Sequence, residues 1–213
     1  WKLKKYRQTW TDADTLNATI GQGYVSVSPF QLAVMAARIA SGRSLVPHLI
    51  GKPQPGTPLS CTPEHLAVVR DAMREVVNGD GTAGRSRLMI PGIEMGGKTG
   101  TAQVRRIAGS QRGQSGTWRY RDHGLFVFFA PTDAPRYAGA VVIEHGMGGA
   151  RAAAPVAKDV MTYLFDAVKA TETLSTMEAG WGGDIKTRMA RQSAGAVASP
   201  TIEAGDALPE VAR

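Results

Sequence analysis

The residues whose types and spacing best suit a chemical reaction lie together in one short segment, Lys98 to Ala102. A strand that carries Lys-Thr-Gly suits acyl transfer onto a serine, because the ammonium of Lys98 supplies a positive charge for a substrate carboxylate or a neighbouring serine. Thr99 and Thr101 project from the same face of a strand, so both hydroxyls can bind that carboxylate. Gly100 has no side chain between them, so a substrate backbone can lie against the strand. The amide of Ala102 would then stabilise an oxyanion.

The same residues also fit a second pattern, the phosphate-binding loop. The segment Gly92–Thr99 reads G-x-x-x-x-G-K-T, which would make the chain a nucleotide-binding protein. That loop needs a strand before its glycines and a helix directly after Lys-Thr. Pro91 stands where the strand should end, and Gly100 would interrupt the first helical turn. The phosphate-binding loop therefore remains the alternative, and a helix beginning at Lys98 would favour it.

Three segments have the patterns of β-strands, namely Lys98–Ile107, His123–Ala130 and Tyr137–Glu144. The second is a continuous apolar run ended by Pro131, which is typical of a fully buried strand. The residues between the second and third segments have hairpin length and turn composition, so these strands are expected to be antiparallel neighbours. The chain is therefore predicted to belong to the α/β class, of the α+β type, with an antiparallel sheet flanked by helices.

Two helices are marked by a capping residue followed by proline, at Ser28-Pro29 and at Thr62-Pro63. The first helix should end at Ser41-Gly42 and is apolar on most sides, which is typical of a buried helix. The second should end at Asn78-Gly79 and has a single apolar face.

The C-terminal part of the sequence should contain one more helix, from about Ala150 to Ala170. Apolar periodicity fades after residue 170, so residues 171–213 are predicted to be a weakly structured to disordered tail. Within it, residues 192–213 are rich in Ala, Ser, Gly, Pro and acids, and they carry too few large apolar side chains to form a core.

The cysteine and histidine content limits the possible disulfides and metal sites. The single cysteine, Cys61, excludes an internal disulfide and a cysteine-based zinc site. The four histidines lack metal-ligand spacing, and His123 and His145 are expected to be structural residues at strand ends. No metal or other cofactor is expected.

The net charge of +7 is concentrated in one stretch. From Met95 to Arg121 there is no acidic residue. A nucleic-acid site is disfavoured because the stretch lacks interleaved aromatic side chains. A basic cleft for a carboxylate and a solvated basic loop both remain, and for Arg105–Arg121 the solvated loop between two strands is favoured. The basic residues are Lys98, Arg105, Arg106, Arg112, Arg119 and Arg121.

Several segments occur in an order and spacing that chance would not assemble: Trp1-Lys2, Thr15-Leu16-Asn17, Ile20–Val25, Ser28–Ala33, Gly97–Gln103, His123–Pro131 and Ala153–Ala157. Over about residues 1–165, the chain resembles the class B penicillin-binding proteins, and within them the penicillin-binding protein 2 group. The resemblance implies a β-lactamase-like transpeptidase fold with the Lys-Thr-Gly strand lining the cleft. It implies a D,D-transpeptidase of cell-wall synthesis and cell shape, which cross-links stem peptides through a serine acyl-enzyme.

By match to the family motif, Lys98, Thr99 and Gly100 are the catalytic-cleft triplet. Thr101 corresponds to a substrate-carboxylate binder, and the Ala102 amide to half of the oxyanion hole. The implied partners are peptidoglycan stem peptides, β-lactam antibiotics, and glycan-polymerising and elongation-complex membrane proteins. The implied location is the inner membrane, with the catalytic domain on the periplasmic side.

The chain departs from the family in its serines. The family uses Ser-x-x-Lys for nucleophile and base and Ser-x-Asn on the facing loop, but no serine here has Lys three or Asn two residues later. In the family both motifs precede the region matched by Trp1. We therefore expect residues 1–170 to be the C-terminal part of an incomplete transpeptidase domain, active in the full-length protein but not alone. A non-enzymatic β-lactam sensor is a further alternative.

Overall fold

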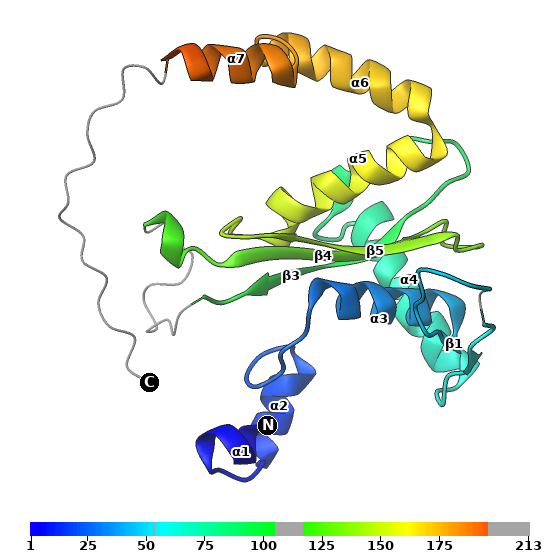
Figure 1. The fold of residues 1–213 in the computed structure, drawn as a ribbon. Helices are drawn as coiled ribbons and strands as arrows, with labels where there is room; N and C mark the ends of the chain where they lie inside the picture. The colour runs from blue at the N-terminus through cyan, green and yellow to red at the C-terminus, as the bar shows by residue number, and fades with distance from the viewer. Residues whose placement is uncertain (53, 105–116, 196–213) are drawn as a thin grey trace, which may run out of the picture. The chain divides into compact units, whose positions relative to one another are not determined.

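The computed structural model describes residues 1–52, 54–104 and 117–195 (Figure 1). The chain divides into two compact units, one comprising Trp1–Asp166 and the other beginning at Ala167. No helix in these described ranges is long and apolar enough to cross a membrane.

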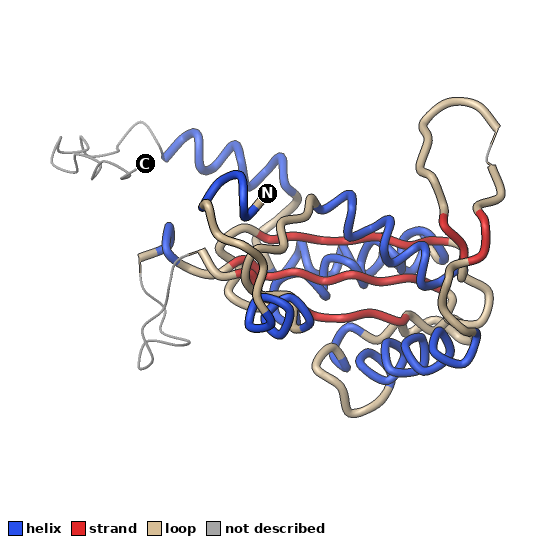
Figure 2. Tube along the Cα trace, turned by 90° about the horizontal axis from the view of Figure 1, so that it is seen from below, coloured by secondary structure: helices blue, strands red, loops and turns tan. Residues whose placement is uncertain are grey.

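The first unit contains a three-stranded antiparallel sheet in the order β3-β4-β5. The strands are β3 (Gly96–Ala102), β4 (His123–Ala130) and β5 (Tyr137–Ile143), and Figure 2 shows them side by side. In this register Lys98 lies opposite Val127, and Val127 lies opposite Ala140. The predicted strands and their antiparallel order are confirmed. The structure ends β3 at Ala102, short of the predicted Ile107, and residues 105–116, which contain most of the predicted basic loop, lie outside the described residues.

Successive side chains of β4 point to opposite faces of the sheet, and each face has its own core. Phe126, Phe128 and Ala130 pack with buried residues of the π-helical turn η4 (Gly149–Ala153) and of α5 (Ala154–Phe165). Val127 and Phe129 pack with residues of α3 (Pro29–Ser41) and α4 (Pro63–Asn78). Figure 1 shows the sheet between α3 and α5. The predicted class, an antiparallel sheet flanked by helices, is confirmed.

The two helices predicted from cap-plus-proline signals begin and end as expected. At the start of α3, the Ser28 hydroxyl accepts a hydrogen bond from the Gln31 backbone N–H, and the Gln31 side chain accepts one from the Ser28 N–H. The helix ends at Gly42, whose φ of 71° favours glycine. At the start of α4, the Thr62 hydroxyl accepts a hydrogen bond from the His65 N–H.

The prediction that the first helix is buried on most sides was wrong for this chain. Only Ala36 and Ala40 of α3 are buried, whereas the Phe30 side chain is 63% exposed and Met35 is 42% exposed. The sheet covers one face of the helix, where small alanines allow close approach. Composition alone cannot show which apolar faces have a neighbour.

The remaining elements of the first unit are short. Near the N-terminus are α1 (Lys2–Tyr6) and α2 (Asp12–Thr19), and the strands β1 (Arg43–Ser44) and β2 (Thr57–Pro58) pair antiparallel. The 3-10 turns in the described residues are η1 (Gly84–Ser86) and η3 (Trp118–Tyr120).

The C-terminal segment differs from its prediction. The helix expected from Ala150 to Ala170 instead begins as the turn η4 and ends at Phe165. Two further helices, α6 (Ala167–Gly180) and α7 (Ile185–Gly195), occupy most of residues 171–195, for which weak structure was expected. No residue of α6 is buried, so the described residues contain no core that packs against this helix. Residues 196–213 of the predicted tail lie outside the described residues.

Candidate active site

Strand β3 presents the candidate residues on two faces. Thr99 and Thr101 lie opposite Phe126 and Gly124 of β4, so both are on the face toward α5. Lys98, Gly100 and Ala102 alternate with them on the other face. The expectation that the two threonines share one face is therefore confirmed.

The Lys98 side chain is exposed and turns back along its own strand. Its Nζ donates a hydrogen bond to the carbonyl oxygen of Thr99 at 2.8 Å. Among the strands that the structure describes, β3 pairs with β4 alone. The ammonium therefore lies at the surface of a strand that is paired on one side, where a second molecule or segment can reach it.

The phosphate-binding-loop alternative is not supported, because the backbone around Lys98 is extended. Residues 96–102 form a strand, whereas the loop requires a helix directly after Lys-Thr. The amides of this segment therefore alternate along a sheet rather than converging on a phosphate.

Two glycines of β3 have different reasons for lacking a side chain. A Cβ on Gly97 would lie 2.3 Å from the Phe126 ring, so core packing requires glycine there. A Cβ on Gly100 would meet only Leu125 Cβ, at an ordinary 3.5 Å. Packing within the described residues therefore requires glycine at position 97 but not at position 100.

The turn η4 lies directly over this part of the sheet. A Cβ on Gly149 would lie 2.0 Å from the Leu125 carbonyl oxygen and 2.9 Å from the Gly100 nitrogen. A Cβ on Gly124 would lie 2.9 Å from the carbonyl carbon and oxygen of Gly148. Two glycines, Gly124 and Gly149, therefore allow the backbone entering α5 to touch the β3–β4 pair at Gly100.

Thr82 contacts the candidate site from the loop after α4. Its Oγ1 lies 2.9 Å from the Oγ1 of Thr99, a hydrogen-bonding distance between two hydroxyls. No motif in the sequence singles out Thr82. A contact between residues this far apart in the sequence leaves no local pattern, so sequence reasoning missed it.

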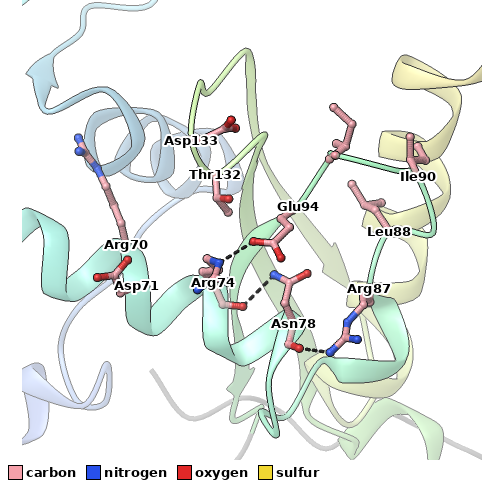
Figure 3. A pocket seen from close by; sticks show the side chains of 12 residues that line it. Arg70, Asp71, Arg74, Asn78, Arg87, Leu88, Ile90, Glu94, Thr132 and Asp133 are labelled. Carbon is pink, nitrogen blue, oxygen red and sulfur yellow. Dashed lines mark hydrogen bonds and ion pairs between the residues drawn. The ribbon is translucent and has the colours of Figure 1, made fainter.

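The segment that leads into β3 is held by polar contacts from α4. The Asn78 side-chain amide donates hydrogen bonds to the carbonyl oxygens of Arg74 and Met95, each at 2.9 Å. Arg74 Nε donates to Glu94 Oε2 at 2.5 Å, and this hydrogen bond raises the pKa of the Arg74 guanidinium. Figure 3 shows Arg74 and Glu94 pointing toward one another. These contacts fix residues 94 and 95, from which the strand continues to Lys98.

The same residues line a pocket of about 680 Å³ between α4 and the segment that precedes β3 (Figure 3). Its lining includes Arg70, Arg74, Arg87, Glu94 and Asp133 but none of the residues from Lys98 to Ala102. Within this lining, the Arg74–Glu94 pair holds the segment before β3, and the Lys-Thr-Gly segment lies outside the pocket.

Two histidines make hydrogen bonds at the end of the sheet where β3 finishes and β4 begins. The backbone N–H of His145 donates to Nδ1 of His123 at 2.9 Å, and Nδ1 of His145 lies 2.9 Å from the Arg121 carbonyl oxygen. Ala102 lies opposite His123 in the sheet register. Both histidines hold strand ends, as predicted. In the described ranges, no group of three His, Cys, Asp or Glu residues could hold a metal ion.

Comparison with known proteins identifies the family. Residues 4–162 match the model of the penicillin binding protein transpeptidase domain. The peptidoglycan D,D-transpeptidase MrdA of Acinetobacter baumannii is 36% identical over 178 residues, which is 76% of this chain and 26% of that protein. The peptidoglycan D,D-transpeptidase PbpA of Mycobacterium tuberculosis is 30% identical over 165 residues, or 70% of this chain and 32% of that protein.

Solved structures show the same relationship. PBP2 of Pseudomonas aeruginosa, in complex with WCK 5153, is 37% identical with a TM-score of 0.59, covering 76% of this chain and 34% of that one. PBP2 of Helicobacter pylori in complex with MreC is 33% identical with a TM-score of 0.64, covering 79% and 30%.

The fold of the matched residues is thus the β-lactamase-like fold of penicillin-binding-protein transpeptidase domains. The chain spans about a quarter to a third of the curated relatives named above. Because the family model matches most of the chain and the relatives share its sequence and fold, the chain belongs to the penicillin-binding protein transpeptidase family.

Proposed function

We propose that this chain supplies one wall of the active site of a peptidoglycan D,D-transpeptidase of the penicillin-binding protein 2 type. The observation that carries the proposal is the placement of Lys98-Thr99-Gly100 in β3, a strand that pairs with β4 alone among the described strands, with the Lys98 side chain exposed. Relatives that bear this activity in their names match the chain across this strand.

In this reaction a serine oxygen attacks a peptide carbonyl of the donor stem peptide, and the terminal amino acid leaves as an amine. The resulting ester is then attacked by an acceptor amine, which restores the serine and forms the cross-link. The serine and its base are not recognisable in this sequence, so the full-length protein must provide them. The chain's own contribution is charge and hydrogen bonding on the opposite wall.

Lys98, Thr99 and Gly100 are proposed as the catalytic-cleft triplet. The Lys98 ammonium attracts the substrate carboxylate. Rotation of the Lys98 side chain is enough to move the ammonium from the Thr99 carbonyl oxygen to the substrate. The hydroxyls of Thr99 and Thr101, on the face opposite Lys98, donate to the same carboxylate, which we place at the edge of β3 that β4 leaves unpaired. Gly100 leaves space for the substrate backbone to pair with the strand.

The oxyanion would be stabilised by a backbone amide near the end of β3. Amides along an antiparallel strand alternate between the paired neighbour and the other side, so only one of Thr101 and Ala102 directs its N–H away from β4. By match to the family motif this role falls to Ala102, and that assignment stays a prediction.

Solved structures of relatives support acylation by β-lactams and an assembly role for the full-length protein. Penicillin-binding protein A of Mycobacterium tuberculosis is described as an imipenem acyl-enzyme complex, and Helicobacter pylori PBP2 is described in complex with MreC. We extend these properties to this protein: a β-lactam acylates it, and elongation-complex and glycan-polymerising membrane proteins bind it. Its proposed location is the inner membrane, with the catalytic domain on the periplasmic side.

Penicillin binding and peptide transfer by the full-length protein test the proposal. Intact-mass analysis after incubation with penicillin should show one covalent adduct, and a donor stem peptide with an acceptor amine should yield cross-linked product. An adduct without any peptide transfer would favour the β-lactam sensor. Absence of both the adduct and the product would overturn the proposed function.

A further inference from the structure

Thr82 lies in a loop whose neighbours are firmly placed. The backbone N–H of Ala83 donates to the Val76 carbonyl in the last turns of α4 at 3.0 Å, and the Ala83 side chain is buried in the core. A Cβ on Gly81 would lie 2.3 Å from Val76 Cα, so glycine is required for the loop to pack on the helix. Residues on both sides of Thr82 are therefore fixed, while Thr82 itself is exposed toward β3.

The hydroxyl of Thr82 reaches a specific atom of the site, the Thr99 hydroxyl oxygen, at 2.9 Å. Each hydroxyl has one proton to donate and two lone pairs that accept. When Thr99 donates to Thr82, it presents only lone pairs to a third group, and these repel an anion. When Thr82 donates to Thr99, the Thr99 proton is free to point at an incoming acceptor.

We propose that Thr82 is a positioning residue for the substrate carboxylate, acting through Thr99. The bound carboxylate selects the arrangement in which Thr82 donates to Thr99 and Thr99 donates to the carboxylate oxygen. A chain of two hydroxyl donors ending on an anion is stronger than a single one, because each bond polarises the next. The inference rests on the proposed function, since it requires a carboxylate-bearing substrate or β-lactam at β3.

The test uses Thr82→Val and Thr82→Ser in the full-length protein with benzylpenicillin. Valine preserves the shape of threonine but removes the hydroxyl, and serine restores it. We expect Thr82→Val to raise the penicillin concentration for half-maximal acylation rate by about three- to tenfold, as for one lost hydrogen bond. The limiting acylation rate should stay within about twofold, because the contact exists before and during the reaction. Thr82→Ser should match wild type.

Penicillin methyl ester separates positioning from a merely structural role. The ester carries no carboxylate anion, so Thr82→Val and wild type should react with it at equal rates, although both react slowly. In a Thr99→Val background, adding Thr82→Val should cause no further loss, because Thr82 acts through Thr99. The surface variant Thr57→Val serves as a control and should behave as wild type with both compounds.

The outcomes of these measurements separate failure of the proposed function from failure of the role proposed for Thr82. If wild type forms no penicillin adduct, the proposed function fails. If wild type is acylated but Thr82→Val has the same concentration dependence, the role of Thr82 is refuted. An equal loss with penicillin and its ester would also refute it, because the defect would then be independent of the carboxylate. Thr82→Ala replaces Thr82→Val in these comparisons if melting curves show that the valine variant is unfolded.

Discussion

Gly149 packs its backbone against Gly100, the last residue of the Lys-Thr-Gly triplet. A Cβ on Gly149 would come within 2.9 Å of the Gly100 nitrogen, 2.8 Å of its carbonyl oxygen and 2.0 Å of the Leu125 carbonyl oxygen. These neighbours are all backbone atoms, so no side-chain rotation can relieve the contact. The turn that begins α5 thus sets the position of β3 at the candidate site.

Gly149→Ala should therefore displace the turn from β3 and lower both the stability and the penicillin acylation rate of the full-length protein. Overpacking of this kind costs about 1–3 kcal/mol in protein cores. Gly148→Ala is the matched control, because a Cβ there meets nothing within 4 Å and φ is an extended −156°. Melting temperature and acylation rate measure both effects. Equal behaviour of the two variants would contradict the packing argument.

Lys98→Ala should strongly reduce penicillin acylation of the full-length protein. The exposed ammonium is the fixed charge of β3, and loss of one positioned charge-stabilising group in an acyl-transfer site costs about 2.7–4 kcal/mol, by analogy with an oxyanion donor. Lys98→Arg should recover part of the rate, since the charge persists while its geometry changes. Stopped-flow acylation measures the rates, and an alanine variant that reacts at the wild-type rate would remove Lys98 from the mechanism.

Asn78→Ala should loosen the segment that leads into β3. The Asn78 amide satisfies the carbonyl oxygens of Arg74 and Met95, and loss of this partner costs about 1–3 kcal/mol if the carbonyls remain shielded from water. Hydrogen exchange of the peptide covering residues 94–102 should become faster. Asn17→Ala, at an exposed site in α2, is the control and should leave that peptide unchanged. Unchanged exchange in Asn78→Ala would show that other contacts hold the segment.

The strands and helix boundaries followed from local signals. Ser28 and Thr62 cap their helices, and the apolar run from His123 to Ala130 is a buried strand ended by Pro131. Each of these features is encoded within a few neighbouring residues, where hydrogen bonding and strand alternation act directly. The prediction that the Lys-Thr-Gly segment lies in a β-strand is confirmed for the same reason.

The contacts around the site could not be predicted in this way. Thr82 meets Thr99, and Gly149 meets Gly100, only because the whole fold brings distant segments together. Gly149 is the residue that permits the second contact, but a single glycine in the sequence does not show which segment its backbone approaches. The exposure of Phe30 depends on which surface covers α3, and no residue of α6 is buried. The sequence of a helix does not show whether another element covers its apolar side chains.

Acid should release the contact that joins α1 to α2. Lys2 donates to Asp14 at 2.5 Å and, together with Thr11, lowers the pKa of that carboxyl below its ordinary 3.8. A lowered folded-state pKa stabilises the folded chain above pH 3.8, and this contribution disappears as the pH falls through the lowered value. Hydrogen exchange of residues 11–20 should differ between wild type and Asp14→Asn at pH 7 and converge in strong acid. A difference that persists undiminished would disprove the linkage.

The 213-residue chain by itself should form no covalent adduct with a labelled penicillin. Acylation needs a serine whose proton is taken by a base within about 3 Å. No serine in this sequence has a lysine three residues later, the helical spacing that places both on one face. The hydrogen bond that Lys98 makes in the described part of the chain goes to the Thr99 carbonyl. Intact-mass analysis after penicillin incubation is the measurement, with the full-length protein as positive control. A stoichiometric adduct that maps to a serine of this chain would show that the nucleophile lies here and that β3 acts with a partner from its own sequence.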